Sequence, residues 1–424
     1  MLIQFSVENF RSFKGKAVLS MEASKDMEKE DHVAVIGKER ILKTAMIFGA
    51  NASGKSNIFM ALTAAILTIR SSNSRQVTDP IQWMVPFAFS EETRRQPTSF
   101  EFVFIVSGKK YVYGFSATAE KVVSEYLYVY HSPRASTIFE RQDETYRFTT
   151  SSIKKELEPI VQRNTPNKLF LATATAWNAK STQEACLWFD KIDTFSNNYG
   201  ELIPRDVDML ENDIDKKLNR FVCDLLKKAD INISEYELQI RDVPTDQWIL
   251  ALPPVLRAVA GDEVISGKHK AYDLLMTHRI EAKNGEIKDW ALNFDEESEG
   301  TKKFFSLSPV LYDVFLNGRI ICIDEFDASL HPLLVSYLVS LFRDSKINIT
   351  NAQLIISAHT MTLLSRRVSR DDEIYFVEKG KETGESELYS LDEFPVRKQT
   401  DIRKAYLLGR FGAIPDIEGG DLLW

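Results

Sequence analysis

Hydrophobic and polar positions alternate with a two-residue period in several segments of the first third of the chain. Residues 2–7 alternate in this way, and residues 17–21 have the pattern of a hairpin partner. Three longer alternating segments follow, with Ser107-Gly108 as one of the turns between them: residues 100–106, 110–117 and 122–130. We therefore expect an antiparallel β-lobe here, whereas the charged stretch 24–31 has the composition of a solvated connection.

An apolar segment, residues 41–48, runs directly into a glycine-containing loop and is followed by a helical pattern. From Lys55 onward, apolar residues recur at spacings of three and four, the period of a helix with one buried face: Ile58, Phe59, Leu62, Ala65, Ile66 and Ile69. Strand, glycine loop and helix in this order are the context that a phosphate-binding loop requires.

The spacing of apolar positions changes twice in the middle of the chain. Residues 151–229 have a helical pattern, including a long stretch over 206–228, and residues 230–295 return to strand-like alternation. We interpret residues 151–295 as a lobe inserted between the two halves of another domain.

The last third has the pattern of a βαβ core. Four elements are predicted in succession: a helix over 301–316, an apolar strand at 320–323, a helix over 330–342 and a buried strand at 353–357. The chain is thus expected to have an α/β fold in which residues 1–150 and 296–424 build one nucleotide-binding head.

The loop after residue 48 contains a complete phosphate-loop motif, G-x-x-x-x-G-K-S. It reads Gly49-Ala50-Asn51-Ala52-Ser53-Gly54-Lys55-Ser56 and is followed by Asn57. In this motif the glycines permit a tight backbone path, and the backbone N–H groups and the helix N-terminus surround phosphate groups. Lys55 is expected to reach the β- and γ-phosphates and Ser56 to ligate Mg²⁺. The alternative is an ordinary glycine turn before a helix.

Two acidic residues end the predicted strand 320–323. Asp324 has the place of the carboxylate that holds Mg²⁺ through a water molecule, and Glu325 has the place of a general base that activates the attacking water. The alternative is an acidic strand end left in solvent.

The sequence lacks the motif that reads a guanine base. No Asn-Lys-x-Asp motif follows the core, since Asn167-Lys168-Leu169-Phe170 lacks the aspartate. ATP with Mg²⁺ is therefore favoured over GTP as the ligand.

Four further residues are candidates because of their positions relative to the predicted strands and helices. Asp327 follows the acidic pair, and His359 follows the last core strand, where a histidine can donate to the γ-phosphate and sense its loss. Ser298 and Gly300, in Glu297-Ser298-Glu299-Gly300-Thr301, open the predicted helix at 301–316, and the N-terminal amides of that helix form an anion-binding end. Read alone, this segment is an ordinary helix cap.

In order along the chain, these motifs resemble the Walker A loop, signature, Walker B, D-loop and switch histidine of an ABC-type ATPase. The chain resembles the RecF, SMC and OLD branch of these ATPases. Three stretches carry the resemblance: Val7-Glu8-Asn9-Phe10-Arg11-Ser12-Phe13, the phosphate loop through Asn57, and residues 403–415, which are similar to the tail of RloA-like, abortive-infection-associated ATPases.

The resemblance implies several contacts to the nucleotide and to a second copy. Arg11 would approach the nucleotide, and Asp327, in the D-loop, would also belong to the nucleotide-binding site. ATP would lie between two heads arranged head to tail, so that Ser298 of one subunit completes the site that holds Lys55 of the other. A homodimer, or a higher oligomer of dimers, is expected. A Q-loop glutamine cannot be placed, and Gln183 is a weak candidate.

The composition of the chain limits the classes of protein to which it can belong and agrees with its interpretation as an ATPase. The 424 residues are 44% hydrophobic, with a net charge of −8 and a pI near 5.5, so a surface coated in phosphate-binding charge is not expected. Cys186, Cys223 and Cys322 have no paired spacing. No segment has the pattern of a signal peptide or a membrane span. These features predict a cytoplasmic protein with no membrane partner.

The biological role is inferred mainly from the resemblance. The leading hypothesis is an ATPase subunit that regulates a separately encoded effector, such as a Toprim-type nuclease, in antiphage or abortive-infection defence. The alternative is a RecF-like DNA-binding ATPase in DNA repair, for which the sequence offers a set of cations: Arg366, Arg367, Arg370, Arg397, Lys398, Arg403, Lys404 and Arg410. A transporter's nucleotide-binding subunit fits less well, because of the Asn9-Phe10-Arg11 start and the β-lobe.

Overall fold

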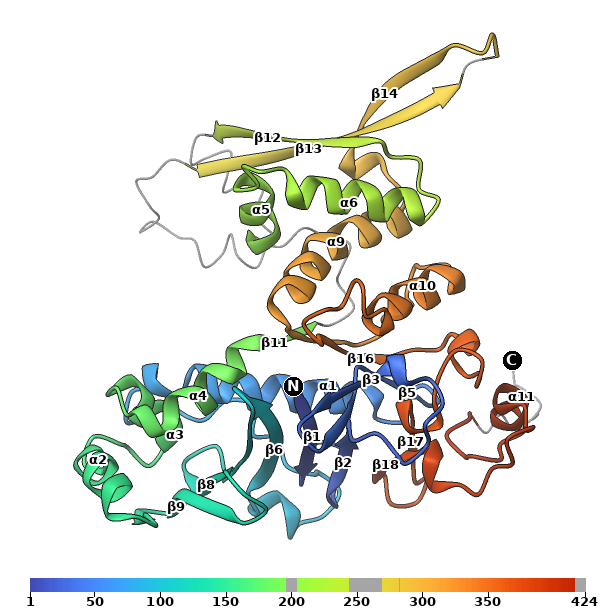
Figure 1. The fold of residues 1–424 in the computed structure, drawn as a ribbon. Helices are drawn as coiled ribbons and strands as arrows, with labels where there is room; N and C mark the ends of the chain where they lie inside the picture. Colours follow the sequence, from blue (N-terminus) through green and yellow to red (C-terminus); the bar gives the residue numbers. More distant parts are fainter. Residues whose placement is uncertain (196–203, 244–268, 282, 416–424) are drawn as a thin grey trace, which may run out of the picture. The chain divides into compact units, whose positions relative to one another are not determined.

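The computed structural model describes residues 1–195, 204–243, 269–281 and 283–415 (Figure 1). The chain forms two compact units, Met1–Asn197 with Val314–Trp424, and Asn198–Asp313. Both ends of the chain thus contribute to the first unit. Residues 151–197 lie within it, although the sequence grouped them with the inserted lobe.

A six-stranded, mostly parallel sheet forms the centre of the first unit. Its strand order is β11-β15-β16-β5-β17-β18, and only β18 runs antiparallel to its neighbour. The strands are β5 (Thr44–Phe48), β11 (Ile192–Phe195), β15 (Ile320–Ile323), β16 (Gln353–Ser357), β17 (Ile374–Lys379) and β18 (Ser386–Ser390). Every residue of β5, β15 and β16 is buried, as expected for strands covered on both faces. The predicted α/β fold is confirmed.

One predicted strand of this region is wrong in its bounds. Residues 41–48 do not form a single strand, because β4 (Glu39–Leu42) ends before Lys43 and pairs with β3 (Val33–Ile36) in a separate two-stranded sheet. Lys43 donates its backbone N–H to the His32 carbonyl and its Nζ to the Asp31 carbonyl, both at 2.9 Å. These bonds hold the bend that directs β5 into the central sheet.

Helices α1 (Lys55–Arg70), α9 (Glu299–Asn317) and α10 (Pro332–Arg343) form where the sequence predicted them. α1 starts directly after the glycine loop. α10 begins with Pro332 at its first position, where a missing N–H costs nothing, and the His331 ring nitrogen accepts a bond from the Leu333 N–H at 3.3 Å.

The β-lobe is a seven-stranded antiparallel sheet in the order β10-β9-β8-β7-β6-β1-β2. Its strands are β1 (Leu2–Glu8), β2 (Ala17–Ser20), β6 (Thr98–Val106), β7 (Lys109–Ala117), β8 (Val122–Tyr130), β9 (Ala135–Gln142) and β10 (Thr145–Arg147). The sequence predicted the first five of these, and β9 and β10 extend the sheet beyond them. Phe104 stacks on Trp188 with ring centroids 3.9 Å apart, which packs the following helices on the lobe. Those helices are α2 (Ser151–Val161), α3 (Phe170–Ala176) and α4 (Lys180–Trp188).

Among its described residues, the second unit contains two helices, three strands and most of α9. They are α5 (Pro204–Glu211), α6 (Lys217–Lys228), β12 (Glu235–Val243), β13 (His269–Glu281) and β14 (Ile287–Asn293). The continuous helix expected over 206–228 is wrong, because the Asp213 carboxylate accepts the N–H groups of Leu218 and Asn219 at 3.1 and 2.7 Å and caps a new helix. The three strands form one antiparallel sheet, with β13 between β12 and β14 (Figure 1).

The remaining elements of the described chain are short. A C-terminal helix, α11 (Ile402–Leu407), follows β18. Single 3₁₀ turns occur at Glu30–His32, Ser72–Ser74, Thr93–Arg95, Phe189–Lys191, Phe294–Glu296, Met361–Leu363, Asp371–Glu373 and Leu391–Glu393.

Candidate functional site

The glycine loop between β5 and α1 leaves no room for side chains at its two glycines. A Cβ on Gly49 would lie 2.4 Å from the Val377 carbonyl oxygen. Gly54 has φ +115°, and a Cβ there would lie 2.5 Å from the Ser386 Oγ and 2.9 Å from the Ser12 Oγ. Only glycine can take this path, which is the requirement that the motif predicts.

Polar groups of the same loop are arranged to bind an anion. The buried Lys55 side chain donates from Nζ to the carbonyl oxygens of Gly49 and Ala50, both at 2.9 Å, so its ammonium lies inside the loop. The Ser53 hydroxyl is buried and has no hydrogen-bond partner among the described residues. A buried hydroxyl without a partner is costly, and a phosphate oxygen would satisfy it. The residues present therefore fit a nucleotide phosphate.

Asp324 and Glu325 lie together at the carboxyl end of β15, beside the end of β16. The Ser357 hydroxyl donates to the Asp324 carboxylate at 2.5 Å and accepts the Glu325 backbone N–H at 2.7 Å. Glu325 has φ +52°, a conformation that a glutamate rarely adopts and that this hydrogen bond helps to hold. One hydroxyl thus fixes both acidic residues of the predicted Walker B motif.

Lys55 of the phosphate loop is close enough to the acidic residues after β15 for their charges to affect its pKa. Burial lowers the pKa of Lys55 below its ordinary value, while the charges of Asp324, Glu325 and Asp327 act in the opposite direction. The three carboxylates therefore act on the lysine that is predicted to hold the phosphates.

Within the described residues, no cluster of three or more His, Cys, Asp or Glu side chains could hold a metal by itself. Mg²⁺ usually takes one or two protein ligands together with phosphate oxygens and water, which matches a site made of Ser56 and Asp324.

Asp327 holds the segment that carries the predicted switch histidine. Its carboxylate accepts the His359 N–H at 2.8 Å and the Thr360 hydroxyl at 2.6 Å. The His359 side chain is exposed, and it lines a hollow of about 1310 Å³ together with residues 49–53 of the phosphate loop. Asp327 thus fixes the backbone of the segment that carries His359.

The N-terminal turn supports the phosphate loop from another direction. The Asn57 amide donates to the Ser12 hydroxyl at 2.7 Å, and Ser386 donates its N–H to the Ser12 carbonyl at 2.7 Å. The Ser386 hydroxyl also donates to the Ser53 carbonyl at 2.6 Å. Sequence reasoning missed both serines. Ser12 could have been found within the Asn9–Phe13 stretch, whereas nothing around Ser386 distinguished it.

Other predicted contact residues lie at the surface of this region. Asn51 and Ala52 are exposed at the tip of the phosphate loop, where Ala52 has φ +61°. Arg11 is also exposed, and its guanidinium lies 5.8 Å from the centroid of the Phe10 ring. These side chains are accessible to a ligand or to a second copy of the chain.

The predicted signature residues lie in the second unit and make local contacts. The Ser298 hydroxyl accepts the Thr301 N–H at 3.2 Å at the start of α9, and Gly300 lies in the first turn of that helix. Ser298 is exposed. Within the chain it is a helix cap, which leaves its predicted contact with a second copy as a proposal.

Three of the eight cations considered for DNA binding are paired with carboxylates: Arg366, Arg370 and Lys398. Arg366 donates to Asp371 at 2.8 Å, and Lys398 donates to Glu28 at 2.7 Å. Five others remain exposed: Arg367, Arg397, Arg403, Lys404 and Arg410. These ion pairs reduce the positive charge that the paired residues offer to the phosphate backbone of DNA.

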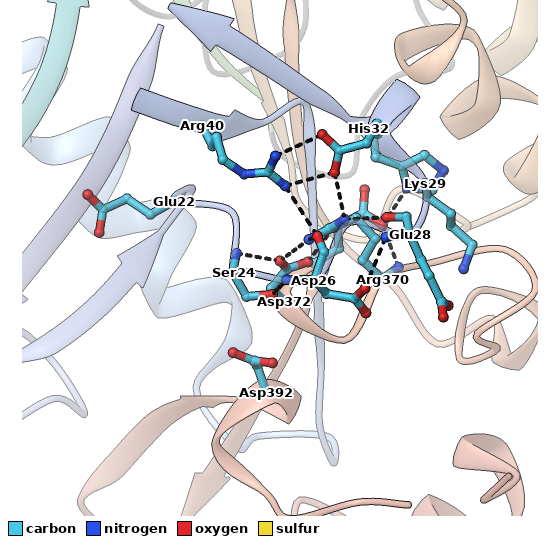
Figure 2. Close-up of polar contacts among 12 residues, drawn as sticks. Glu22, Ser24, Asp26, Glu28, Lys29, His32, Arg40, Arg370, Asp372 and Asp392 are labelled. Atoms are coloured by element: carbon cyan, nitrogen blue, oxygen red, sulfur yellow. Dashed lines mark hydrogen bonds and ion pairs between the residues drawn. The ribbon is translucent and has the colours of Figure 1, made fainter. Parts of the chain in front are cut away.

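Arg370 is buried and joins the N-terminal loop to the C-terminal segment (Figure 2). It pairs with Asp372 at 2.7 Å and donates to the backbone carbonyls of Glu28 and Asp26. Asp372 in turn accepts the Ser24 N–H at 2.7 Å. Most residues of the charged stretch 24–31 are exposed, so its interpretation as a solvated connection is confirmed, and Arg370 additionally ties its backbone to the C-terminal segment.

Two general features of the described residues bear on the class of protein. None of their helices is both long and apolar enough to cross a membrane. Cys186 and Cys223 are partly buried and Cys322 is buried, and all three are free thiols. Neither observation adds a second candidate site to the one described above.

Comparison with known proteins gives a family and a similar fold. The family described as "AAA domain, putative AbiEii toxin, Type IV TA system" matches residues 45–365. Among solved structures, the SMC head domain from Thermotoga maritima is similar, with 14% sequence identity and a TM-score of 0.41, over 92% of this chain and 98% of that chain. No curated protein matches the chain. The predicted resemblance to abortive-infection-associated ATPases is confirmed at the level of the family. Since the match runs from β5 past the switch histidine and covers more than half of the sequence, the chain belongs to this family of AAA-domain P-loop ATPases.

Proposed function

We propose that the chain binds ATP with Mg²⁺ and hydrolyses it. The observation that carries this proposal is the meeting of an anion-binding loop and an acidic strand end at one edge of the central sheet. The Lys55 ammonium and the Ser53 hydroxyl face the place of the phosphates, and Asp324 and Glu325 act on the same lysine. A cation, a hydroxyl and paired carboxylates are the groups that phosphoryl transfer to water requires.

Each residue has a separate task in this proposal. Ser56 and Asp324 hold Mg²⁺, which neutralises charge on the phosphates when it is bound. Glu325 accepts the proton of the attacking water. His359, held at its backbone by Asp327, donates to the terminal phosphate and loses this contact after hydrolysis.

We further propose that two chains share each ATP in a head-to-tail dimer. Ser298 is exposed directly before α9 and Gly300 lies in its first turn, so this helix end can meet the γ-phosphate held by Lys55 of another copy. Ser298→Arg should block closure, so the variant should stay monomeric with ATP when its mass is measured by light scattering. Ser132→Arg is the matched control, because Ser132 is also an exposed serine. A Ser298→Arg protein that still dimerises with ATP would disprove the shared site.

We propose that the ATPase acts by controlling a separate effector protein. The description of the matching family names an AbiEii toxin and a toxin–antitoxin system, which supports a role in defence. We expect the ATP-bound form to control an effector such as a Toprim-type nuclease. Tagged Glu325→Gln protein, purified from its native host with ATP and Mg²⁺, should carry that effector in stoichiometric amount in mass spectrometry. Elution of the chain alone would contradict this role.

The RecF-like alternative makes a different prediction for the same preparation. A repair ATPase would elute as a dimer that holds DNA, and this binding would collapse between low and moderate salt because bound counterions are released from the phosphates. Carboxylates beside Arg366, Arg370 and Lys398 already neutralise part of the charge that such a groove needs. These ion pairs support the effector hypothesis only by weakening the case for a DNA-binding groove.

A further inference from the structure

One aromatic side chain beside the phosphate loop is exposed and yet held in place. Phe89 is 69% exposed, although Phe87 packs edge-on against it at 5.6 Å and the Lys379 Nζ lies 5.8 Å from its ring centroid. Gly384 has φ +67°, and a Cβ there would lie 2.7 Å from the Phe89 ring. The ring therefore lies directly on the backbone of the β17–β18 turn. The ring is thus held in place while most of its surface stays accessible to solvent.

Phe89 lines two neighbouring hollows, one of which is also lined by the phosphate loop. It lines the hollow of about 1310 Å³ that also contains residues 49–53, and it lines a neighbouring hollow of about 440 Å³. The turn beneath it is tied to the phosphate loop, because the Ser386 hydroxyl donates to the Ser53 carbonyl at 2.6 Å. The ring is thus fixed relative to the groups that would hold the phosphates.

The turn that contains Asn9 and Arg11 positions the loop that carries Phe89. The Asn9 amide donates to three carbonyls of this loop at 2.8 to 3.2 Å, those of Thr93, Gln96 and Pro97. The Asn9 side-chain oxygen accepts the Phe87 N–H at 3.0 Å, and Arg11 donates its N–H to the Val85 carbonyl at 2.8 Å. The N-terminal turn therefore holds residues 85–97 beside the phosphate loop.

We propose that Phe89 is the platform on which the base of the bound nucleotide stacks. A base has a polarisable face of the same size as a phenyl ring, and stacking on an aromatic side chain stabilises it without reading its hydrogen-bonding edges. The phosphates would lie in the loop of residues 49–56, and the base would extend through the shared hollow to Phe89. This inference rests on the proposed function, since it places the remainder of the ATP molecule.

The test compares ATP with inorganic triphosphate, which has the phosphates but no base. Phe89→Ala should weaken ATP binding by about tenfold in isothermal titration. The same variant should bind triphosphate with Mg²⁺ as the unchanged chain does. Phe89→Trp should restore the affinity for ATP. Trp83→Ala is the control, because Trp83 is an exposed aromatic residue of the preceding segment that lines neither hollow, and it should change nothing.

The possible failures have different meanings. Unchanged ATP affinity in Phe89→Ala, with normal triphosphate binding, would overturn the stacking platform and leave the phosphate site intact. Loss of triphosphate binding in Phe89→Ala would also overturn it, because the ring would then support the loop and not the base. Absence of triphosphate and ATP binding in the unchanged chain would instead disprove the proposed function.

Discussion

A single hydroxyl connects the two carboxylates on which the proposed chemistry depends. Ser357 donates to Asp324 and accepts the N–H of Glu325, whose backbone is in the left-handed region. The residue proposed to hold Mg²⁺ and the proposed base therefore share one anchor. A shift of this anchor would move both groups together, and small displacements of catalytic groups have large effects on rate.

Removing that hydroxyl should affect turnover more than binding. Ser357→Ala leaves the Glu325 N–H without its acceptor and frees the Asp324 carboxylate. We expect kcat for ATP hydrolysis to fall about tenfold, which corresponds to the loss of one or two hydrogen bonds. The Kd for ATP without Mg²⁺ should stay unchanged. Ser308→Ala is the control, because the buried Ser308 hydroxyl donates within α9, to the Phe304 carbonyl. Equal losses in both variants would contradict the positioning role of Ser357.

Residues with a local motif could be predicted from the sequence, and residues defined by distant partners could not. Gly49, Gly54 and Lys55 lie within a motif of eight residues, so their arrangement is encoded locally. Ser386 meets Ser53 across 333 positions of sequence, and a serine alone carries no sign of such a partner. The supporting hydroxyls around the site are therefore visible only in the fold.

At the scale of elements, the strongest periodic segments were predicted best. α1, α9 and α10 have long apolar faces, and the fully buried β16 forms at the predicted residues 353–357. β11 has only four residues and follows a helical segment, so its pattern is too short to distinguish a strand from a helix. Its place at the sheet edge depends on parallel pairing with β15.

Several elements of the first unit are joined by one buried charge network around Glu373. Its carboxylate accepts bonds from Thr44 at the start of β5, from His32, and from Arg343 at the end of α10. Burial alone would raise the pKa of Glu373, but Arg343, His32 and the Arg370 N–H lower it below its ordinary value. Because the folded-state pKa is depressed, this group stabilises the fold above the ordinary value of 4.5 and loses its contribution as the pH falls below it.

Breaking this network should show the same dependence on pH. Arg343→Met leaves the Glu373 carboxylate buried without its main partner, which costs about 3–5 kcal/mol of unfolding free energy. Urea denaturation at pH 7 should show this loss. At pH 4 the difference between the variant and the unchanged chain should be smaller, because a protonated Glu373 no longer needs the guanidinium. A difference that is constant over this range would contradict the linkage.

At the scale of the whole molecule, both chain ends build the unit that contains the proposed nucleotide site. The phosphate loop, the acidic strand end and the switch histidine lie in the first unit, whereas Ser298 lies in the second. The sequence predicted that the first and last thirds form one domain. It could not give the boundaries, because the aromatic contacts that keep residues 151–197 with the β-lobe, such as Phe104 on Trp188, depend on three-dimensional packing.

A site shared between copies predicts that activity depends on protein concentration. The ATP turnover rate per chain should rise with concentration and become constant once the dimer is complete, because an isolated chain lacks the signature serine of its partner. Steady-state phosphate release over a hundredfold range of protein concentration tests this. A rate per chain that stays constant down to the lowest concentration would show that one copy suffices.

The most direct test of the account combines equilibrium binding with single-turnover hydrolysis for the unchanged chain, Glu325→Gln and Lys55→Ala. We predict that the unchanged chain and Glu325→Gln bind ATP·Mg²⁺ with similar Kd. The glutamine variant should hydrolyse it at least about a hundredfold more slowly, because it lacks only the base. Lys55→Ala should bind no ATP. Hydrolysis by Glu325→Gln at the unchanged rate, or ATP binding that survives Lys55→Ala, would contradict the proposal that these residues form one ATP-hydrolysing site.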